Sequence, residues 1–534
     1  MNNPNALPKS EPWICKGTPN KPHSEIENWG DNCIFLDCKN SRIGLHKTVP
    51  FSPSDNRKKL MTLIGITLTL TAGLGSGVYL WQKFKPCPRG QEKQNGVCLL
   101  LSNSINSPTS SPTTITFNPD WVSQSDRILF KGSSNKDRDL GIEAVKNGDY
   151  AAAIKYFEKA VFSNRNDPEV QIYLNNARAA LQGSPLKIAA VVPVDNRATS
   201  AQEMLRGVAD AQTRFNDEVG VGGRLVQIII ANDGNEPQRA QSIARQLASD
   251  AEILGVIGHN SSSASEAALA EYTQGGLAMI SPTSTSTSLK SNYFFRTVPT
   301  NVAHGQKLAE YANNMGINQV AVFYNPRSSY SKSLQQAFET HFQQLGGNVL
   351  GSIDLKDPNF DPKQQIQTIQ GQVDAIALFP NTDTTSVAIG ITRANKELST
   401  PKLPMLGGDA LYSSQTLNDG GSAVNGLAIA IPWFAADQSY ARTASQRWIG
   451  AVNWRTAASF DATQALLKTL AINPTRASVL QNLPTVNLNA RETAGEPLSF
   501  VNGERLGEPV LVKILPGAIG KPRDFNNGFQ LIQP

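Results

Sequence analysis

Cysteine and histidine are scarce in this chain of 534 residues. The five cysteines all lie in the first hundred residues, at Cys15, Cys33, Cys38, Cys87 and Cys98. The long remainder therefore has no thiol nucleophile, no disulfide and no thiolate-bound metal. Five histidines leave little acid–base machinery, and the main part of the chain shows no Walker loop, G-x-S-x-G elbow or H-E-x-x-H sequence. These absences argue against an enzyme, a cofactor and a metal site.

An excess of charge of one sign is also missing. The formal net charge is +5, and lysines and arginines are scattered among the acidic residues, so no nucleic-acid surface is indicated. Glycine and proline are too few for a fibrous protein. A chain of this length is too long for one compact core and indicates several domains.

One long uncharged run stands out at residues 60–81, LMTLIGITLTLTAGLGSGVYLW. About 20 helical residues cross the hydrocarbon core of a bilayer, and Tyr79 and Trp81 suit the interface. The sequence predicts a transmembrane helix here, with a buried core helix as the alternative. We do not expect a cleaved signal peptide here, because 59 residues precede the run. Basic residues flank both ends, so the positive-inside rule does not fix its orientation.

The segments on either side of this run are interpreted from their composition and their cysteines. Cys87 and Cys98 bracket a short polar loop and suit a disulfide in an oxidising compartment, with two free thiols as the alternative. In the polar region 1–59, three cysteines and His23 could bind zinc, but no C-x-x-C pair is present. Reduced cysteines in a poorly ordered tail are the favoured interpretation. Residues 82–134 are expected to be a loop followed by a linker rich in Ser, Thr and Pro.

Residues 135–183 carry small and aromatic residues at helical spacing, among them Gly141, Ala144, Tyr150, Ala153 and Phe157. This hairpin resembles a tetratricopeptide repeat. A single repeat cannot stack on neighbours, so a helical spacer packed on the next domain is favoured over a peptide-binding groove.

From residue 186 apolar, β-branched segments alternate with amphipathic segments: KIAAVVPV, RLVQIIIAND, ILGVIGH and LAMISPT come first, then QVAVFYNP, NVLGSIDL, DAIALFP and PMLGGDAL. This pattern is typical of parallel sheets covered by helices on both faces. We expect an α/β domain over 184–534 with two doubly wound parallel-sheet lobes and a hinge. Lobe 1 takes about 186–300 and 434–505, and lobe 2 takes about 301–433 and 506–534. The connecting strands should lie near 298–303, 430–435 and 505.

Two of the predicted strands end in hydroxyl-rich stretches, ILGVIGHNSSSAS at 253–265 and LAMISPTSTSTSL at 277–289. Ligands bind beyond the carboxyl ends of parallel strands, and helix N-termini favour anions. Plain N-capping needs one hydroxyl for each helix, and these runs exceed that need. The pattern favours a site for an anionic group such as a carboxylate.

Residues 186–515 resemble the type I periplasmic solute-binding proteins of the leucine/isoleucine/valine-binding group. The matching segments run in order: VIGHNSSSAS, MISPTSTSTSL, FRTVPTN, AVFYNPRSSYSKSL, MLGGDALY and SFDATQALLKTL. The resemblance implies that an amino acid is clamped between the lobes. Its carboxylate would lie on Ser262, Thr283 and Thr285, its ammonium on Asp409, and Tyr330 would close over it. Ser261 would be a further ligand-binding residue.

Two positions depart from the family pattern. Asn381 or Thr382 stands where an aromatic residue is often found, and Arg197 in the first loop could enter the cleft and favour an acidic or more polar ligand. The resemblance therefore implies an amino-acid site whose side-chain preference is open.

We thus expect a single-pass protein of a bacterial inner membrane. Residues 1–59 would be cytoplasmic and the C-terminal domain periplasmic. It would bind an amino acid by hinge closure and serve an ABC importer, whose permease and ATPase subunits it would need as partners. The alternatives are a membrane-tethered sensor that signals through a partner, and a scaffold that has lost its ligand.

Overall fold

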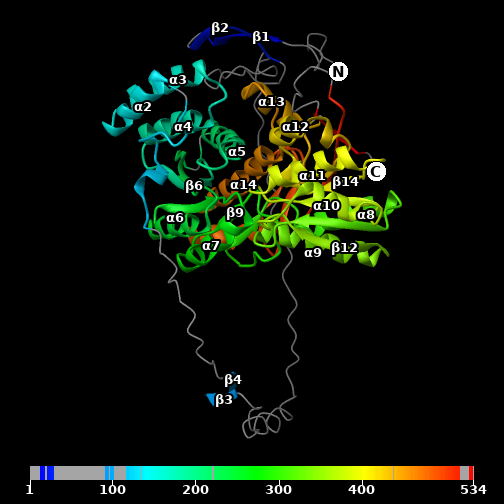
Figure 1. Ribbon diagram of the computed structural model, residues 1–534. Coiled ribbons are helices and arrows are strands. Elements are labelled where there is room, and N and C mark those ends of the chain that lie inside the picture. The colour runs from blue at the N-terminus through cyan, green and yellow to red at the C-terminus, as the bar shows by residue number, and fades with distance from the viewer. Residues whose placement is uncertain are drawn as a thin grey trace, which may run out of the picture. The chain divides into compact units, whose positions relative to one another are not determined.

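The computed structural model (Figure 1) describes residues 116–517, except 133, 219, 221 and 437, together with 528–532 and two short hairpins nearer the N-terminus. The hairpins pair β1 (Trp13–Thr18) with β2 (Lys21–Asn28), and β3 (Gln91–Gln94) with β4 (Val97–Leu100). Residues 1–114 and 115–534 form separate units. The run 60–81 and Cys87 lie outside the described residues. Within the described ranges, no helix has the length and apolarity needed to span a bilayer.

Lobe 1, as we define it, is built on a nine-stranded sheet with the order β16-β17-β18-β10-β9-β8-β6-β7-β5. Its six central strands, from β18 to β7, are parallel. Except for β18, these strands consist mostly of buried apolar residues, as expected of strands covered on both faces. The strands are β5 (Val122–Ser123), β6 (Leu186–Val192), β7 (Val226–Asn232), β8 (Ile253–Ile257), β9 (Met279–Ser281), β10 (Phe294–Arg296), β16 (Asn487–Leu488), β17 (Leu498–Val501) and β18 (Glu504–Arg505).

Helices cover both faces of this sheet (Figure 1). One face carries α6 and α7, whose apolar residues share a core with β6 to β9. The other carries α5 and α14, which approach so closely at Gly207 that a side chain there would lie 2.1 Å from the Thr456 carbonyl oxygen. The lobe-1 helices are α5 (Ala198–Asp217), α6 (Pro237–Ser249), α7 (Ser262–Gln274), α13 (Ser439–Arg447), α14 (Trp454–Leu470), α15 (Arg476–Asn482) and the 3₁₀ turn η4 (Leu483–Thr485).

Lobe 2 is built on a seven-stranded sheet with the order β12-β11-β13-β14-β15-β19-β20. Helices α8 and α9 pack on one face, and α10 and α11 on the other. The strands are β11 (Gln319–Tyr324), β12 (Asn348–Asp354), β13 (Ala375–Phe379), β14 (Met405–Gly407), β15 (Ala428–Ile431), β19 (Val510–Ile514) and β20 (Phe529–Leu531). The helices are α8 (Asn301–Asn314), α9 (Ser329–Gln344), α10 (Pro362–Ile369), α11 (Thr385–Leu398) and α12 (Ser414–Gly420), with 3₁₀ turns η2 (Asp409–Leu411) and η3 (Gly421–Val424).

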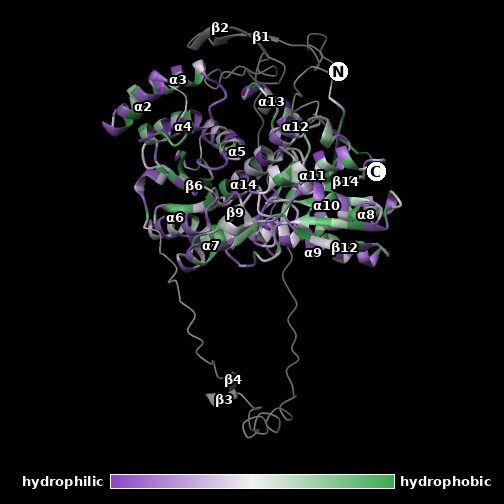
Figure 2. Cartoon of the chain, in the orientation of Figure 1, coloured by the Kyte–Doolittle hydropathy of each residue, from purple (hydrophilic) through white to green (hydrophobic). Residues whose placement is uncertain are grey.

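Both sheets are mixed rather than wholly parallel, which corrects the expectation from the sequence. The pairs β16–β17, β17–β18 and β5–β7 are antiparallel in lobe 1, and so are β15–β19 and β19–β20 in lobe 2. The pairs β16–β17, β17–β18 and β19–β20 join consecutive strands of the chain without an intervening α-helix, as antiparallel neighbours can. The pairs β5–β7 and β15–β19 bring together strands that lie far apart in the sequence. The chain passes between the two sheets at 297–300, 432–438 and 506–509. The hydropathy colouring marks purple and green sides on many of the covering helices (Figure 2).

Residues 116–183 are part of the packing of lobe 1. The turn η1 (Pro119–Trp121) leads into β5, which extends the sheet beside β7. The linker expected over 82–134 therefore gives way to ordered structure from residue 116. Three helices follow: α2 (Lys136–Lys146), α3 (Tyr150–Ser163) and α4 (Pro168–Gln182). Helix α4 packs on α5 and β7. Residues 115–534 thus contain complete sheets and cores of their own.

The side chain of Asn176 in α4 continues the cover of the β7 edge. Its Nδ2 donates to the Ile228 carbonyl oxygen at 2.7 Å, and its Oδ1 accepts from the Ile228 N–H at 2.8 Å. The amide thus imitates a neighbouring strand where β5 does not reach. A buried backbone group without a partner destabilises a fold.

We predict that Asn176→Ala lowers the free energy of unfolding of residues 115–534 by about 2–4 kcal/mol, because it leaves a buried N–H and a buried C=O unpaired. Asn313→Ala, at an exposed position of α8, is the matched control and should change it by less than about 0.5 kcal/mol. Urea unfolding measures both. If both substitutions change the free energy of unfolding by equally small amounts, water or a shifted strand must bond the Ile228 N–H and C=O groups.

A buried carboxyl group joins α4 to the preceding segment. Glu169 Oε1 accepts from the Leu129 N–H at 2.7 Å and from the Tyr173 hydroxyl at 2.8 Å. Burial raises the pKa of Glu169 to about 7, against the opposing effect of these hydrogen bonds. Its folded-state pKa is above the ordinary value, so its stabilising contribution is complete below about pH 4.5 and is lost as pH rises through 7.

Between pH 5 and pH 8 the unfolding free energy should therefore fall by about 2–3 kcal/mol more in the natural protein than in Glu169→Gln. The glutamine retains an acceptor for Leu129 but does not titrate. Urea unfolding at the two pH values checks this difference. Parallel pH profiles for the two proteins would contradict a protonated Glu169.

Candidate functional site

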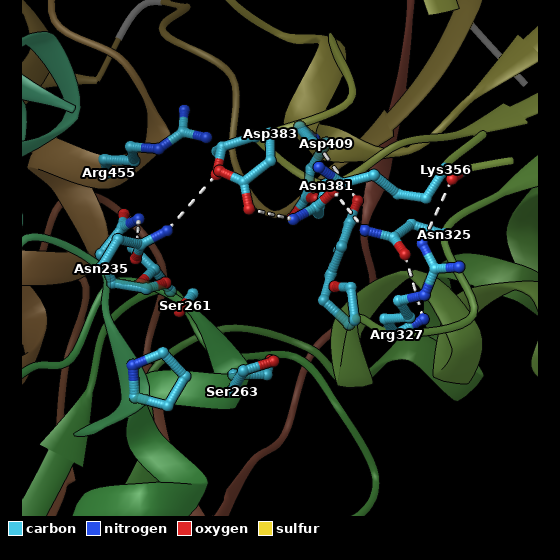
Figure 3. A pocket seen from close by; sticks show the side chains of 18 of the residues that line it. Asn235, Ser261, Ser263, Asn325, Arg327, Lys356, Asn381, Asp383, Asp409 and Arg455 are labelled. Atoms are coloured by element: carbon cyan, nitrogen blue, oxygen red, sulfur yellow. Dashed lines mark hydrogen bonds between the residues drawn. The ribbon is translucent and has the colours of Figure 1, made fainter. Parts of the chain in front are cut away.

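A cavity of about 240 Å³ lies between the lobes, at the carboxyl ends of both sheets. The five parallel strands β6 to β10 of lobe 1 and β11 to β15 of lobe 2 both have the order 2-1-3-4-5. The strand order therefore reverses between the first and third of these strands, where open α/β sheets bind ligands. Figure 3 shows Asn235, Ser261 and Ser263 on one side, and Asn325, Arg327 and Lys356 on the other. The loops after β7, β8, β9, β11, β13 and β14 provide Asn235, Asn260, Ser261, Thr283, Asn325, Arg327, Asn381, Thr382, Asp383 and Asp409.

On the lobe-1 side, the N-terminus of α7 faces the cavity. Ser261 is the N-cap, and its Oγ accepts from the Ala264 N–H at 3.2 Å. The first N–H groups of a helix have no partner within the helix. Ser262 is buried, lines the cavity and accepts from the Ser286 N–H, so its own hydroxyl proton is available. Ser261, Ser262 and Ser263 thus present an anion-binding helix end to the cavity.

Thr283 lines the same wall but is oriented differently. Its hydroxyl donates to the carbonyl oxygens of Asn260 and His259, at 2.8 and 3.1 Å. Because a hydroxyl has one proton, Thr283 can offer a ligand only its oxygen, as an acceptor. This geometry suits an ammonium better than the carboxylate expected from the resemblance.

Most of the other hydroxyls stabilise the loops. Ser265 bonds Ser284, and the Ser281 hydroxyl donates to the His259 carbonyl. Thr285 is fully buried and does not line the cavity, and its Oγ1 has no partner among the described residues. The buried Arg296 guanidinium donates to the carbonyl oxygens of residues 284, 286 and 289. Most hydroxyl groups of the two hydroxyl-rich runs therefore form hydrogen bonds within the loops.

On the lobe-2 side, Asp409 is 4% exposed and lies after β14 in the turn η2. The Tyr330 hydroxyl from α9 accepts from the Ala410 N–H at 3.4 Å, and burial together with the negative charge of Asp409 raises the pKa of Tyr330. Gly408 permits the contact, since a Cβ there would lie 2.5 Å from the Tyr330 oxygen and 2.6 Å from Leu334. Asn381 also lines the cavity, where its Oδ1 accepts from Asn325 at 3.0 Å.

Arg197 lies between the two lobes. It lines an adjoining cavity of about 440 Å³ and forms an ion pair with Asp383 across the two lobes. Other bonds also cross the cleft, from Asn235 to Thr382 at 3.4 Å and between the Thr287 and Ser333 hydroxyls at 3.1 Å. The lobes are therefore in contact around the cavity, and Arg197 contributes to that contact.

The lining residues that sequence reasoning missed include Trp454 and Arg455, at the start of α14. The Arg455 guanidinium stacks on the Trp454 ring at 4.2 Å from its centroid. They stand one turn before the segment SFDATQ that carried the resemblance. That segment has a structural role, since Asp461 accepts from the Ala494 N–H and forms an ion pair with Arg505 at 2.8 Å. His259, between Asp233 and Tyr272, is structural as well.

Gly408→Ala should lower the free energy of unfolding by about 1–3 kcal/mol, because the added methyl group overpacks Tyr330 and Leu334. Gly450→Ala is the matched control, since its nearest contact would be 3.9 Å away, and it should change stability by less than about 0.5 kcal/mol. Urea unfolding compares them. Equal stabilities would mean that Tyr330 moves aside without cost.

Comparisons with known proteins add to this geometry. The sequence profile of the periplasmic binding protein family matches residues 185–506. The amino acid binding protein of Pseudomonas aeruginosa is 26% identical over 153 residues, which are 28% of this chain and 41% of that protein. The Leu/Ile/Val-binding protein of Escherichia coli K12 is 26% identical over 147 residues, 27% of this chain and 40% of that protein. The matched stretches span about two fifths of these relatives.

Solved structures show the same fold. The ABC transporter substrate-binding protein of Desulfitobacterium hafniense, in complex with Leu, has a TM-score of 0.55 at 21% identity, over 65% of this chain and all of that one. The leucine binding protein of Thermotoga maritima has a TM-score of 0.57 at 19% sequence identity, over 65% of this chain and 98% of that one. A solute binding protein of Rhodopseudomonas palustris BisB5, in complex with 3,4-dihydroxy benzoic acid, has a TM-score of 0.55 at 17% sequence identity. The match covers 62% of this chain and 93% of that one. At these identities the likeness concerns the fold.

Proposed function

Since the chain belongs to the periplasmic binding protein family, we propose that it binds an amino acid between its lobes and delivers it to an ABC importer. The observation that carries the proposal is the polarity of the cavity. An anion-binding helix end on lobe 1 faces a buried carboxylate, Asp409, on lobe 2. A zwitterion satisfies both walls with one molecule. Proteins of this family bind solutes and are not enzymes.

The carboxylate of the ligand would lie at the N-terminus of α7. Ser262 and Ser263 line the cavity there, and the free N–H groups and the positive end of the helix dipole favour an anion. Ser262 has a hydroxyl proton to donate, since its oxygen already accepts from Ser286. Thr285 belongs to the support beneath this wall.

The ammonium would lie between Asp409 and Thr283. Asp409 provides the negative charge, and hydrogen bonds to a charged group are the strong ones. Thr283 offers only an acceptor, because its proton is held by backbone carbonyls. Tyr330 holds Asp409 in place and closes the lobe-2 wall. Asn381 connects this wall to the loop after β11.

Binding would draw the lobes together by rotation about the three crossings at 297–300, 432–438 and 506–509. The contacts across the cleft, including the Arg197–Asp383 ion pair, belong to the closed form. Relatives and structural neighbours are named for binding leucine, isoleucine and valine, which supports an amino acid as the ligand class.

We further propose that residues 60–81 anchor the protein in a bacterial inner membrane, with residues 184–534 in the periplasm, residues 1–59 in the cytoplasm and Cys87–Cys98 as a disulfide. The uncharged run of 22 residues supports the anchor. The permease and ATPase subunits of the importer would be its partners. A membrane-tethered sensor would use the same binding site with a signalling partner instead.

Titration calorimetry of residues 115–534 with the common amino acids tests the binding site. We expect at least one to bind, and Asp409→Asn to weaken binding about 100-fold or more, because truncating a buried charge partner costs roughly 2–5 kcal/mol. Asp419→Asn, exposed in lobe 2, is the matched control and should bind normally. Absence of binding by every amino acid would refute the proposal. Binding unaffected by Asp409→Asn would refute the placement of the ammonium.

A further inference from the structure

Arg455 is a buried cation whose guanidinium forms no ion pair and no hydrogen bond with the described residues. Its side chain lines both cavities, the residue is 7% exposed, and its Nε is buried without an acceptor in the described part of the chain. The guanidinium lies over the face of the Trp454 ring. A guanidinium has five donors and stays charged. An unpaired charge of this kind is strongly unfavourable in a protein interior.

The neighbouring carboxylates do not neutralise it directly. Glu203 lines the second cavity, but its oxygens are taken by Arg206 and by the Thr456 hydroxyl. The charge of Asp409 acts on Tyr330, and Asp409 forms no ion pair within the described ranges. Burial lowers the pKa of the Arg455 guanidinium, while the negative charges of Asp409 and Glu203 oppose that shift. These charges act on Arg455 without occupying its donors.

The residue beside Arg455 has an unused donor of the same kind. The Trp454 indole Nε1 is buried and has no acceptor among the residues that the structure describes, and Trp454 also lines the central cavity. Both residues belong to the first turn of α14, a helix of 17 residues whose N-cap, Asn453, lines the second cavity. A second helix N-terminus therefore reaches the cleft, together with two orphaned buried N–H donors and a fixed positive charge. Donors and charge of this sign point to an anion.

The other cationic side chains of the cleft are either paired or exposed, so they are weaker candidates than Arg455 for binding an anionic group. Arg197 is paired with Asp383. Arg327 is 63% exposed and lies 3.7 Å from Asp354. In Figure 3 Arg327 and Lys356 lie on the side of the cavity opposite Arg455. The described lining thus contains one buried, unpaired cation and one buried, unpaired anion, Arg455 and Asp409.

We propose that the ligand of this cleft is an amino acid with an acidic side chain, and that Arg455 with Trp454 binds its side-chain carboxylate. The inference rests on the proposed function, since it keeps the α-carboxylate at α7 and the ammonium at Asp409. If the ligand ammonium pairs with the Asp409 carboxylate, that carboxylate cannot also pair with Arg455. The Arg455 guanidinium then needs a second anionic group. A ligand with two carboxylates and one ammonium satisfies all three subsites. A leucine-like ligand would close the cleft over an unpaired guanidinium.

The test compares isosteric ligands on residues 115–534 by titration calorimetry. L-Glutamate and L-aspartate should bind about 100-fold or more tightly than L-glutamine and L-asparagine, because only the acids provide a partner for the buried charge. Glutarate, which lacks the ammonium, should bind at least tenfold more weakly than L-glutamate. These comparisons use the natural protein and do not depend on the folding of a variant.

Arg455→Gln should then lose about 100-fold or more of its affinity for the acidic amino acid while its affinity for L-glutamine changes less than about threefold. Arg491→Gln, exposed in lobe 1, is the matched control and should leave both affinities unchanged. Thermal unfolding of Arg455→Gln establishes that the variant is folded. Equal losses for both ligands would indicate a merely structural arginine and overturn the proposal.

The remaining outcomes separate this inference from the function on which it rests. Tighter binding of L-leucine or L-isoleucine than of L-glutamate would overturn the acidic ligand and leave amino-acid binding intact. Binding of glutarate as tight as that of L-glutamate would show that Asp409 does not bind the ammonium, and would overturn the three-subsite inference. No binding of any amino acid would refute the proposed function itself.

Discussion

The separation of charge inside the cleft is the constraint on which this architecture depends. Asp409 and Arg455 are 4% and 7% exposed and come from opposite lobes. Neither side chain could be held away from water by a single lobe, because each lies at a strand or helix end that faces the other lobe. Interaction between buried charges is strong where water is excluded. A ligand that pairs with both charges therefore stabilises the closed arrangement of the two sheets.

A second constraint is the rigidity of the loops that carry the site. The hydroxyl-rich runs after β8 and β9 bond one another and the backbone, and Arg296 donates to three carbonyl oxygens of the second run. Glu504 from β18 forms an ion pair with Arg296 at 2.7 Å, so the third crossing is tied to the same loop. Small side chains allow these segments to pack tightly enough to exclude water. The helix end at Ser262 is thereby fixed before any ligand arrives.

The sequence predicted the architecture better than the site. The alternation of apolar strands with amphipathic helices is a local signal, and it indicated both lobes and the strand ends that meet at the cavity. Ser261, Ser262, Thr283, Tyr330, Asn381 and Asp409 line that cavity. Thr285 and Arg197 do not, because burial beneath a wall and pairing across lobes depend on tertiary contacts that no pattern reports. The strand β5 was missed because two residues in a linker composition carry little propensity, and their partner lies more than a hundred residues away.

Arg455 illustrates the same limit most clearly. It lies 46 positions after Asp409 in the chain, at the start of a helix of lobe 1, whereas Asp409 belongs to lobe 2. The resemblance drew attention to the segment one turn later, whose Asp461 is structural. A basic residue in the first turn of a helix opposes the helix dipole, and this local conflict was the one signal in the sequence that could have identified it.

A crystal structure of residues 115–534 grown with L-glutamate tests the central claim most directly. The account predicts the ligand between the lobes, with its ammonium on Asp409, its α-carboxylate at the N-terminus of α7 and its side-chain carboxylate within hydrogen-bonding distance of Arg455. A ligand bound outside this cavity, or one whose ammonium lies away from Asp409, would contradict it.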